Sequence, residues 1–321
     1  VIRRRGGRGP GAAARRERDV EQSMYAAMRV GIVHFKAYPG IETGTGPIVE
    51  TLERLCADEF WTAVEVGWIK DYRERSEARH LLDQSHLSVA YATQPKMLSN
   101  KFNLNHFDAG ERAKAVEAVK SSVDEARQLG AEVVRLIAGK DPGDARRGEA
   151  KKLLIDSLQQ ILEYAAEDGD GLRFTLKLFD RRIDKKNLIG PAHDALDIAR
   201  ALRPAWPNFG LLVDLSHFPL LDETPDESIP MLAGHLDAVH LGNCHFRDKR
   251  HPAHGDIQPR FGLPGGETDT PEVAHFFRVL RANGFFDKPE RPIVSAEVRP
   301  VLAGERSEVI LANAKRVIRD A

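Results

Sequence analysis

An eightfold alternation of short apolar runs with helical patterns limits what this chain can fold into. From Met28 onward, each apolar run of five or six residues is followed by a segment whose apolar residues recur at helical spacing. The apolar runs occupy residues 29–34, 62–67, 87–92, 132–137, 172–177, 209–214, 236–240 and 292–297. Strands that alternate with helices in this way predict a parallel sheet, because each helix carries the chain back to begin the next strand.

The segments between the strands have the apolar stripe of helices that pack on a sheet. In one of them, Val116, Val119, Val123 and Ala126 lie on one face, and Gly130 follows where a helix commonly ends. Helices are predicted at 47–56, 72–82, around 116–126, 154–165, 192–202, 227–232, 271–282 and 307–318. Eight strand–helix pairs in about 290 residues indicate one (β/α)8 TIM barrel over residues 28–321, with an open doubly wound sheet as the main alternative.

Residues 1–27 differ from the rest in composition. Residues 1–18 contain seven arginines and one acid, a charge of +6, so the formal net charge of −1 leaves −7 on the remainder. The segment is rich in arginine and glycine and lacks apolar periodicity, so we expect it to be a disordered basic tail. An acidic barrel is a poor partner for nucleic acid, and none is expected.

Two general features predict the compartment. The only cysteines, Cys56 and Cys244, are too few for a disulfide framework, so we expect a reducing, cytoplasmic setting. No apolar run approaches the roughly 20 residues that a membrane span needs. We therefore expect no membrane partner, and leave open a homo-oligomer or a small partner subunit.

The last residues of the fifth to eighth predicted strands indicate a functional site. They are Lys177, Asp214, His240 and Glu297. In a (β/α)8 barrel the carboxyl ends of the strands meet at one mouth, where reactive groups lie. Two carboxylates and an imidazole are typical ligands of a divalent metal ion. The alternative is that each residue is an isolated polar strand end.

Five segments carry a family resemblance. They are FDRRIDKKNLIGP (179–191), VDLSHFPLL (213–221), AVHLGNCHFRD (238–248), GDIQPRFGLPGGETD (255–269) and SAEVRP (295–300). They resemble the sugar phosphate isomerases and epimerases of the xylose isomerase-like TIM barrel superfamily, over nearly all of the chain beyond Met28. The resemblance implies that Asp214, His240 and Glu297 hold a metal ion (Mn, Mg or Co, with Zn as a further option). It also implies proton transfer next to the carbonyl group of a small sugar or polyol.

Lys177 departs from the family pattern, which has a glutamate at the end of the fifth strand. A protonated lysine has three donors and no acceptor, so it cannot bind a metal ion. Three interpretations remain open. The ammonium replaces the metal and pairs with Asp214 and Glu297; or burial lowers the pKa of Lys177 and makes it a base or Schiff-base nucleophile; or a metal ion binds weakly through the other three residues.

Four further residues are candidates for substrate binding. The resemblance implies a substrate contact for His217, in DLSH, although a loop histidine could occupy that place without function. Arg247 could clamp hydroxyl, carboxylate or phosphate groups, or be a solvated loop residue. Glu65, in AVEVGW, is costly to bury without a partner, which a structural salt bridge would also supply. His34 is predicted to end the first strand and to face the mouth.

Three function classes follow. The leading hypothesis is a metal-assisted isomerase or epimerase, or a related lyase, in which Glu297 and Lys177 are the catalytic residues. The second is a catalytically impaired barrel that binds a sugar or a partner subunit, which Lys177 favours. The third, an endonuclease IV-like repair enzyme, would need more metal ligands and a basic face for DNA. The chain has no phosphate-binding GxxxxGK[ST] loop and no CxxC pair.

Overall fold

The computed structural model describes residues 23–169 and 171–321, and within these ranges eight parallel strands form a closed barrel. The strands are β1 (Arg29–Val33), β2 (Ala63–Val66), β3 (Ser88–Ala92), β4 (Val133–Ile137), β5 (Arg173–Lys177), β6 (Phe209–Asp214), β7 (Leu236–Gly242) and β8 (Ile293–Glu297). Each strand pairs with the next in sequence, and β8 closes the ring on β1, with Val30 opposite Val294. The predicted (β/α)8 barrel is confirmed.

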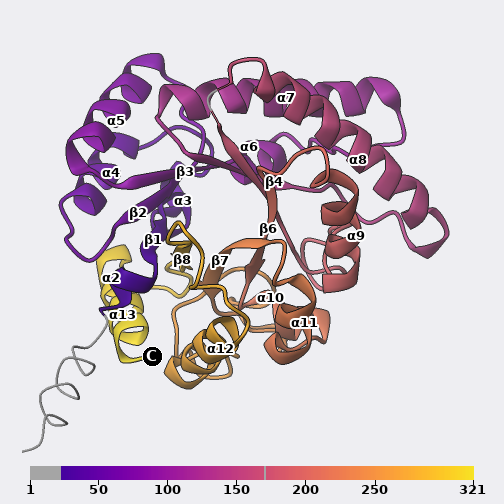
Figure 1. Ribbon diagram of the computed structural model, residues 1–321. Helices are drawn as coiled ribbons and strands as arrows, with labels where there is room; N and C mark the ends of the chain where they lie inside the picture. Colours follow the sequence, from indigo (N-terminus) through magenta and orange to yellow (C-terminus); the bar gives the residue numbers. More distant parts are fainter. Residues whose placement is uncertain (1–22, 170) are drawn as a thin grey trace, which may run out of the picture.

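Helices cover the outside of the barrel (Figure 1). In chain order the helical elements are α2 (Met24–Ala27), α3 (His34–Ala37), the 3-10 turn η1 (Pro39–Ile41), α4 (Ile48–Cys56), α5 (Tyr72–Ser85), α6 (Gln94–Ser99), α7 (Ala109–Gln128), α8 (Asp144–Ala166), α9 (Ala192–Leu202), α10 (His217–Leu221), α11 (Pro225–Leu232), α12 (Thr270–Ala282) and α13 (Ser307–Asp320). Among the described residues, none of these helices combines the length and the hydropathy of a membrane span.

Two boundaries differ from the sequence-based expectation. The first strand ends at Val33, because the backbone turns into the short helix α3 at His34. Residues 24–27, which were assigned to the tail, form α2 beside β1. Residues 1–22 of the predicted tail lie outside the described residues.

Strand alternation divides the barrel into an outer and an inner core. On β5, Phe174 and Leu176 belong to the large core between strands and helices, whereas Thr175 and Lys177 alternate with them and face the interior. A second, small cluster of interior side chains consists of Ala63, Ala90, Val133 and Ile293. Ala63 and Val133 precede the polar residues Glu65 and Arg135 by two positions, so this cluster lies one layer below them.

Local sequence signals fix the ends of several helices. Asp108 accepts the backbone N–H of Glu111 at 2.9 Å and caps α7. A reciprocal capping box between Asp269 and Glu272 begins α12. Gly130 follows α7 with a φ of 71°, a left-handed conformation that favours glycine. These local contacts set where α7 and α12 begin and where α7 ends.

Candidate active site

The predicted strand-end residues meet inside the barrel mouth. Lys177, Asp214, His240 and Glu297, which we call the mouth group, end or nearly end β5, β6, β7 and β8. Their relative exposures are between 0 and 2%. The strand register explains the meeting, because Asp214 lies opposite His240, and Glu297 opposite Gly242. The sequence-based placement of these four residues is reproduced by the fold.

Lys177 is held by both carboxylates of the mouth group. Its ammonium forms an ion pair with Glu297 and lies 3.2 Å from Asp214 Oδ2. It also lies 4.9 Å from the centre of the Phe179 ring, within the range of a cation–π contact. Burial alone would lower the pKa of Lys177, but the charges of Glu297 and Asp214 outweigh it and raise that pKa. This shift is opposite to the one that a neutral lysine base or Schiff-base nucleophile requires.

His240 lies between two carboxylates. Its Nδ1 is 2.6 Å from Glu297 Oε2, and its Nε2 is 3.0 Å from Glu65 Oε2. Carboxylates only accept hydrogen bonds, so both ring nitrogens must donate, which makes His240 an imidazolium. Burial alone would lower the pKa of His240, but the charges of Glu65 and Glu297 raise it.

Local structure around Asp214 aims one of its oxygens at Lys177. The backbone N–H and the hydroxyl of Ser216 donate to Asp214 Oδ1 at 3.0 and 2.8 Å. Gly242 makes room for this carboxylate, since a Cβ there would lie 2.8 Å from Asp214 Oδ1. The other oxygen, Oδ2, is left facing the ammonium.

A second set of polar residues lies deeper in the barrel. We call Glu65, Arg135 and Thr175 the lower group; Thr175 precedes Lys177 by two residues on β5. Arg135 donates to Glu65 Oε2 at 3.3 Å and to Thr175 Oγ1 at 3.0 Å. Although burial alone would raise the pKa of Glu65, the nearby His240 and Arg135 lower it. His240 therefore links the lower group to the mouth group.

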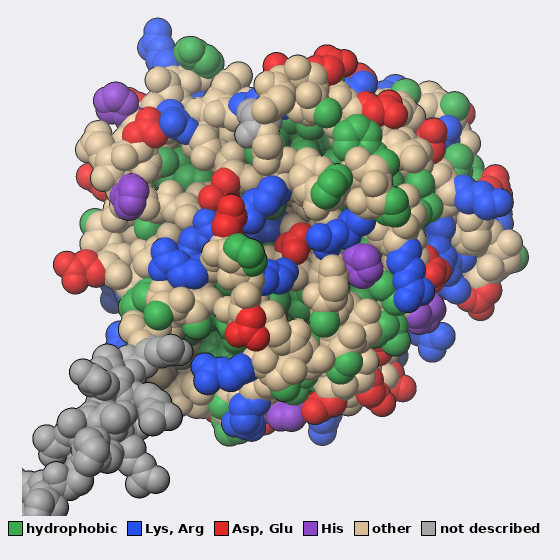
Figure 2. Space-filling model, viewed as in Figure 1, with side chains coloured by type: hydrophobic (Ala, Val, Ile, Leu, Met, Phe, Trp, Pro, Cys, Tyr) green, Lys and Arg blue, Asp and Glu red, His purple; other side chains and the backbone are tan. Residues whose placement is uncertain are grey.

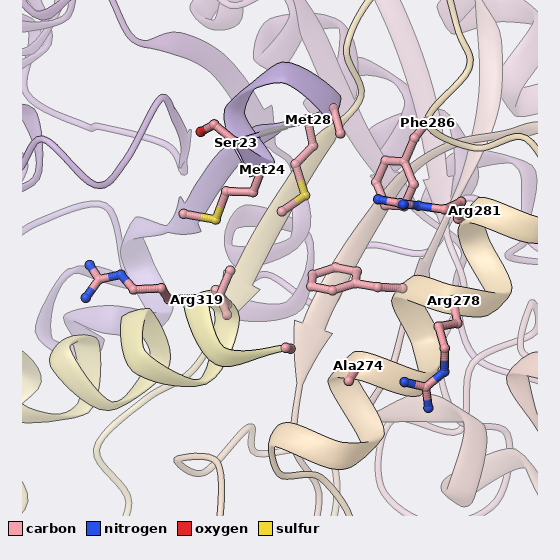
Figure 3. Close-up of a pocket in the computed structure, with 12 residues that line it drawn as sticks. Ser23, Met24, Met28, Ala274, Arg278, Arg281, Phe286 and Arg319 are labelled. Atoms are coloured by element: carbon pink, nitrogen blue, oxygen red, sulfur yellow. The ribbon is translucent and has the colours of Figure 1, made fainter. Parts of the chain in front are cut away.

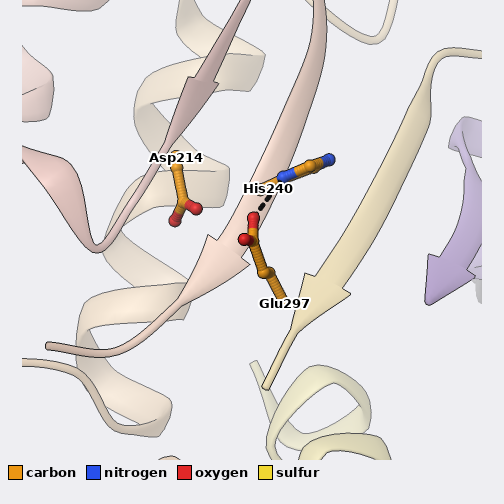
Figure 4. Close-up of side chains that lie close together, drawn as sticks. All are labelled: Asp214, His240 and Glu297. Atoms are coloured by element: carbon orange, nitrogen blue, oxygen red, sulfur yellow. Dashed lines mark hydrogen bonds and ion pairs between the residues drawn. The ribbon is translucent and has the colours of Figure 1, made fainter. Parts of the chain in front are cut away.

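A divalent metal ion was the cofactor implied by the sequence. Taken alone, Asp214, His240 and Glu297 form a group that could hold one, because a ligand atom from each lies within 4.8 Å of the others (Figure 4). However, the ammonium of Lys177 already faces two of these residues.

Charge repulsion is a further argument against a divalent metal ion beside Lys177. Two like unit charges about 4 Å apart repel by about 4 kcal/mol at an effective dielectric constant of about 20, and a divalent ion doubles that repulsion. A metal ion on Asp214 and Glu297 would lie about that close to the ammonium. The three candidate ligands fit a divalent ion, but the four residues of the mouth group together do not.

Three residues separate the mouth group from a cavity. We call Lys36, Asp256 and Gln258 the roof residues. Lys36 Nζ donates to Gln258 Oε1 at 3.1 Å and lies 3.8 Å from Glu297 Oε1, while Gln258 donates to Asp256. Gln258 has a φ of 55°, a strained conformation of the kind that clusters at functional sites. Lys36 and Asp256 line a cavity of about 420 Å³ that extends to Gln94, Lys185 and Arg299.

His217 connects the roof to the mouth group, so the fold brings it to the site, while its substrate contact stays a prediction. Its Nε2 lies 3.3 Å from Asp256 Oδ1 and 3.9 Å from Asp214 Oδ2, and its ring packs edge-on against Phe179. Asp256 also contacts Lys185 at 3.3 Å. Burial alone would raise the pKa of Asp256, but His217 and Lys185 lower it to about 2.

Several polar atoms of this region are buried without a hydrogen-bond partner. Among the described residues, they include Asp214 Oδ2, Glu297 Oε1, Asp256 Oδ2 and both ring nitrogens of His217. Buried polar atoms normally have partners, and an unpaired one carries a desolvation penalty of about 1–3 kcal/mol. The three carboxylate oxygens lie 3.2–3.8 Å from the ammonium groups of Lys177, Lys36 and Lys185 but accept no hydrogen bond. Together with the imidazole of His217, they form a site suited to the hydroxyl groups of a ligand.

Two predicted substrate contacts lie elsewhere. The side chain of His34 points out of the barrel interior toward α4, where its Nε2 is 2.8 Å from Thr51 Oγ1, and burial lowers its pKa to about 3. The side chain of Arg247 is 74% exposed and pairs with Glu267 at 2.7 Å. The structure brings neither of them to the mouth group. Glu65 is in the network, but in the lower group.

Sequence reasoning missed Asp256, Gln258 and Arg135, whereas Lys36 was expected to face the mouth. Asp256 and Gln258 lie in the long loop after β7, where no periodicity shows which side chains turn inward. Arg135 did carry a signal, because a charge within the apolar run VVRLI is costly to bury without a partner. That partner is Glu65, which the same reasoning had identified.

The surface and a second cavity contribute little to this site. On the face shown in Figure 2, acidic and basic side chains are interspersed. A larger cavity, of about 680 Å³, lies at the opposite end of the barrel, between α2 and the helices α12 and α13 (Figure 3). Met24, Met28 and Phe286 line it, together with Arg278, Arg281 and Arg319. It contains none of the predicted site residues.

Comparisons with solved structures support the fold. A D-tagatose 3-epimerase-like protein is 16% identical, with a TM-score of 0.65, and the match covers 91% of this chain and 99% of that one. An L-ribulose 3-epimerase is 18% identical (TM-score 0.63; 89% and 86% covered), and the IolI protein with a bound zinc atom is 15% identical (TM-score 0.67; 91% and 97% covered). No curated protein sequence matches the chain.

The comparison with family models is more specific. The model described as xylose isomerase-like TIM barrel matches residues 54–309, which include all strands from β2 to β8 and every residue of the mouth group. This agrees with the resemblance in the segments that end the later strands. The chain therefore belongs to the xylose isomerase-like TIM barrel family.

Proposed function

We infer that this protein binds a small sugar or polyol at the barrel mouth and transfers a proton next to its carbonyl group, as an isomerase, epimerase or related lyase. The observation that carries this inference is a set of buried polar atoms without a hydrogen-bond partner, on Asp214, Glu297, Asp256 and His217. Hydroxyl groups both donate and accept, so a polyol supplies partners to carboxylates and imidazole alike. The sugar epimerases with the same fold favour the same ligand class.

In this mechanism Glu297 removes the proton from the carbon beside the carbonyl group. The electron pair of the broken C–H bond forms the C=C bond of an enediolate, and the carbonyl π electrons move to the oxygen. Lys177 donates a hydrogen bond to that oxygen and stabilises its developing charge. Glu297 then returns the proton to the former carbonyl carbon. The hydroxyl group on the deprotonated carbon becomes the new carbonyl group, and its proton passes to the former carbonyl oxygen, which completes an isomerisation. In an elimination, the enolate oxygen re-forms the carbonyl group, and a leaving group on the carbon beyond the deprotonated one departs with its bonding electrons.

The ion pair between Lys177 and Glu297 couples the hydrogen bond that Lys177 donates to the basicity of Glu297. In the free protein, burial alone would raise the pKa of Glu297, but Lys177 and His240 lower it well below its usual value, so its carboxylate is a weak base. When Lys177 turns its hydrogen bond to the substrate oxygen, Glu297 loses that stabilisation and becomes more basic. Glu297 is the only carboxylate with the role of base, because Lys177 stands where the resemblance implies a second one. A single base favours one-sided isomerisation or elimination over epimerisation, which uses a group on each face.

Substrate access requires movement of the roof. Lys36 lies between the cavity and Glu297, and a sugar oxygen that reaches the mouth group must displace it. This burial favours a second candidate function, a barrel that binds a sugar without turnover. The two functions share the ligand and differ in proton transfer.

Solvent deuterium exchange distinguishes them. The purified protein is incubated in D2O with ketopentoses, ketohexoses and inosose-like cyclic ketones, and NMR follows deuterium at the carbon beside the carbonyl group. Catalysed exchange with at least one compound supports the enzyme; binding by calorimetry without exchange supports the second candidate. Neither binding nor exchange across the panel would contradict both. The exposed α8 variant Glu163→Gln serves as the control.

A further inference from the structure

The cation inside this barrel mouth is a side chain of the protein itself. Lys177 Nζ pairs with Glu297 and lies 3.2 Å from Asp214 Oδ2, so it occupies the space between two of the three candidate metal ligands. A divalent ion would have to bind the same oxygens at about 2.0–2.2 Å. One set of carboxylates cannot hold both cations at these distances without strong repulsion.

The buried carboxylates of this network have cationic partners without a metal ion. Arg135 pairs with Glu65, Lys177 with both Asp214 and Glu297, and Lys185 with Asp256. All four carboxylates are at most 2% exposed. A divalent ion would add two further positive charges to this buried region, which is unfavourable.

Lys177 also has the charge that a metal site would have at this position. One carboxylate together with one divalent ion carries a net charge of +1, the same as one ammonium. Replacement of Lys177 by glutamate would therefore leave a deficit of two positive charges in the network, which a divalent ion would offset.

We propose that the ammonium of Lys177 is the resident cation of this site and takes the place of a divalent metal ion. In the free protein it neutralises Asp214 and Glu297. In the complex it donates to an oxygen of the sugar, and Asp214 Oδ2, which has no hydrogen-bond partner, accepts from a neighbouring hydroxyl. The role in the complex rests on the proposed function, whereas the absence of metal binding does not.

Titration with Mn²⁺ tests this proposal without a substrate. Wild-type protein, dialysed against chelator, is titrated with MnCl2 by calorimetry and by the electron paramagnetic resonance signal of free Mn²⁺, alongside Lys177→Glu and Lys177→Gln. We expect no saturable binding by the wild type up to millimolar Mn²⁺. Lys177→Glu is expected to bind one ion at least about 100-fold more tightly, because an oxygen ligand replaces a repelling charge. A purely structural lysine would not create metal affinity on substitution.

Controls locate the ion and allow for a folding defect. Lys177→Glu combined with Glu297→Gln should lose the gained affinity, and the exposed α8 variant Lys152→Glu should not gain any. If Lys177→Glu unfolds in the absence of metal, Mn²⁺ should raise its melting temperature and leave that of the wild type unchanged. If it does not fold even with Mn²⁺, Lys177→Gln decides in the same titration.

Two results would overturn the proposal. Stoichiometric Mn²⁺, Mg²⁺, Co²⁺ or Zn²⁺ in the wild type, with an affinity equal to that of Lys177→Glu, would show that Lys177 does not exclude the ion. Failure of every folded variant to bind would show that Lys177 does not stand in a metal position. A failed sugar screen with a positive titration would reject the proposed function and retain this proposal.

Discussion

The mouth group and the lower group lie inside the same barrel, two residues apart along β5, and both join buried cations to buried carboxylates. They differ in how far their hydrogen bonds are satisfied. In the lower group, every buried polar side-chain atom of Glu65, Arg135 and Thr175 has a hydrogen-bond partner. In the mouth group, Asp214 and Glu297 each have one oxygen that accepts no hydrogen bond. A buried network in which every atom is paired rigidifies a core, while unpaired atoms leave capacity for a ligand.

This contrast explains why two similar ion pairs have different expected roles. In the lower group, Arg135 and Glu65 neutralise one another far from the cavity, and their contribution is to stability. In the mouth group, Lys177 and Glu297 neutralise one another only until a ligand replaces part of the contact. Substitutions in the two groups should therefore separate stability from chemistry.

The largest expected effect comes from removing the charge of Glu297. Glu297→Gln keeps the shape of the side chain but cannot accept the substrate proton, so exchange should fall by about 10²–10⁴-fold, the usual contribution of a general base. The matched lower-group variant Glu65→Gln should lose less than about tenfold. NMR rates in D2O measure both. Equal losses would erase the functional distinction between the groups.

The lower group should dominate stability. Arg135→Met leaves Glu65 buried with one cationic partner fewer, and loss of one member of a buried ion pair costs about 3–5 kcal/mol. Urea unfolding at pH 7 measures the change in the free energy of unfolding. The exposed Arg316→Met on α13 is the control, with a change within about 0.5 kcal/mol. If Arg135→Met matched this control, the lower group would have no structural role.

The stability of the fold at acid pH should also depend on His34, which lies in neither group. The pKa of His34 is about 3 in the folded protein, where burial disfavours its charged form, and about 6.5 in the unfolded chain. The unfolded chain therefore takes up a proton first as the pH falls. As a result, the free energy of unfolding decreases by about 2 kcal/mol between pH 7 and pH 5. His34→Gln cannot take up that proton, so its stability should fall by about 2 kcal/mol less over this range. Urea unfolding at the two pH values tests this, and an unchanged pH dependence would contradict it.

The smallest effect is expected at Arg247, which lies in neither group. Its ion pair with Glu267 is largely exposed, and exposed pairs contribute about 0–1 kcal/mol. Arg247→Ala should leave sugar affinity within about twofold of the wild type, since a solvated side chain makes little difference to a buried site. Calorimetry with the best ligand of the panel measures this. A loss of tenfold or more would restore Arg247 as a substrate contact.

The fold and the mouth group were predictable because they follow from chain order. Eight strand–helix repeats close a barrel, and the residues that end consecutive strands must then meet at one mouth. Lys177 was recognised as a departure through the family resemblance, which implies a glutamate at the end of the fifth strand. Its partners could be predicted, although the direction of its pKa shift depends on distances that only the structure provides.

The other site residues could not be placed from the pattern. Asp256 and Gln258 turn inward from a long loop, and the sequence has no period there to show it. His34 was misplaced because one residue decides between strand and helix: β1 ends at Val33, so the next side chain points toward α4. In both cases backbone direction, not residue type, decides which side chains reach the site.

If Lys177 supplies the positive charge on which chemistry at this mouth depends, that chemistry needs no metal ion. The rate of carbon-bound proton exchange in D2O by the wild-type protein, before and after exhaustive treatment with EDTA, tests this, with metal content checked by mass spectrometry. We expect the same rate in metal-free protein and no increase when Mn²⁺ is added back. Loss of exchange on chelation, with recovery on addition of Mn²⁺, would contradict it.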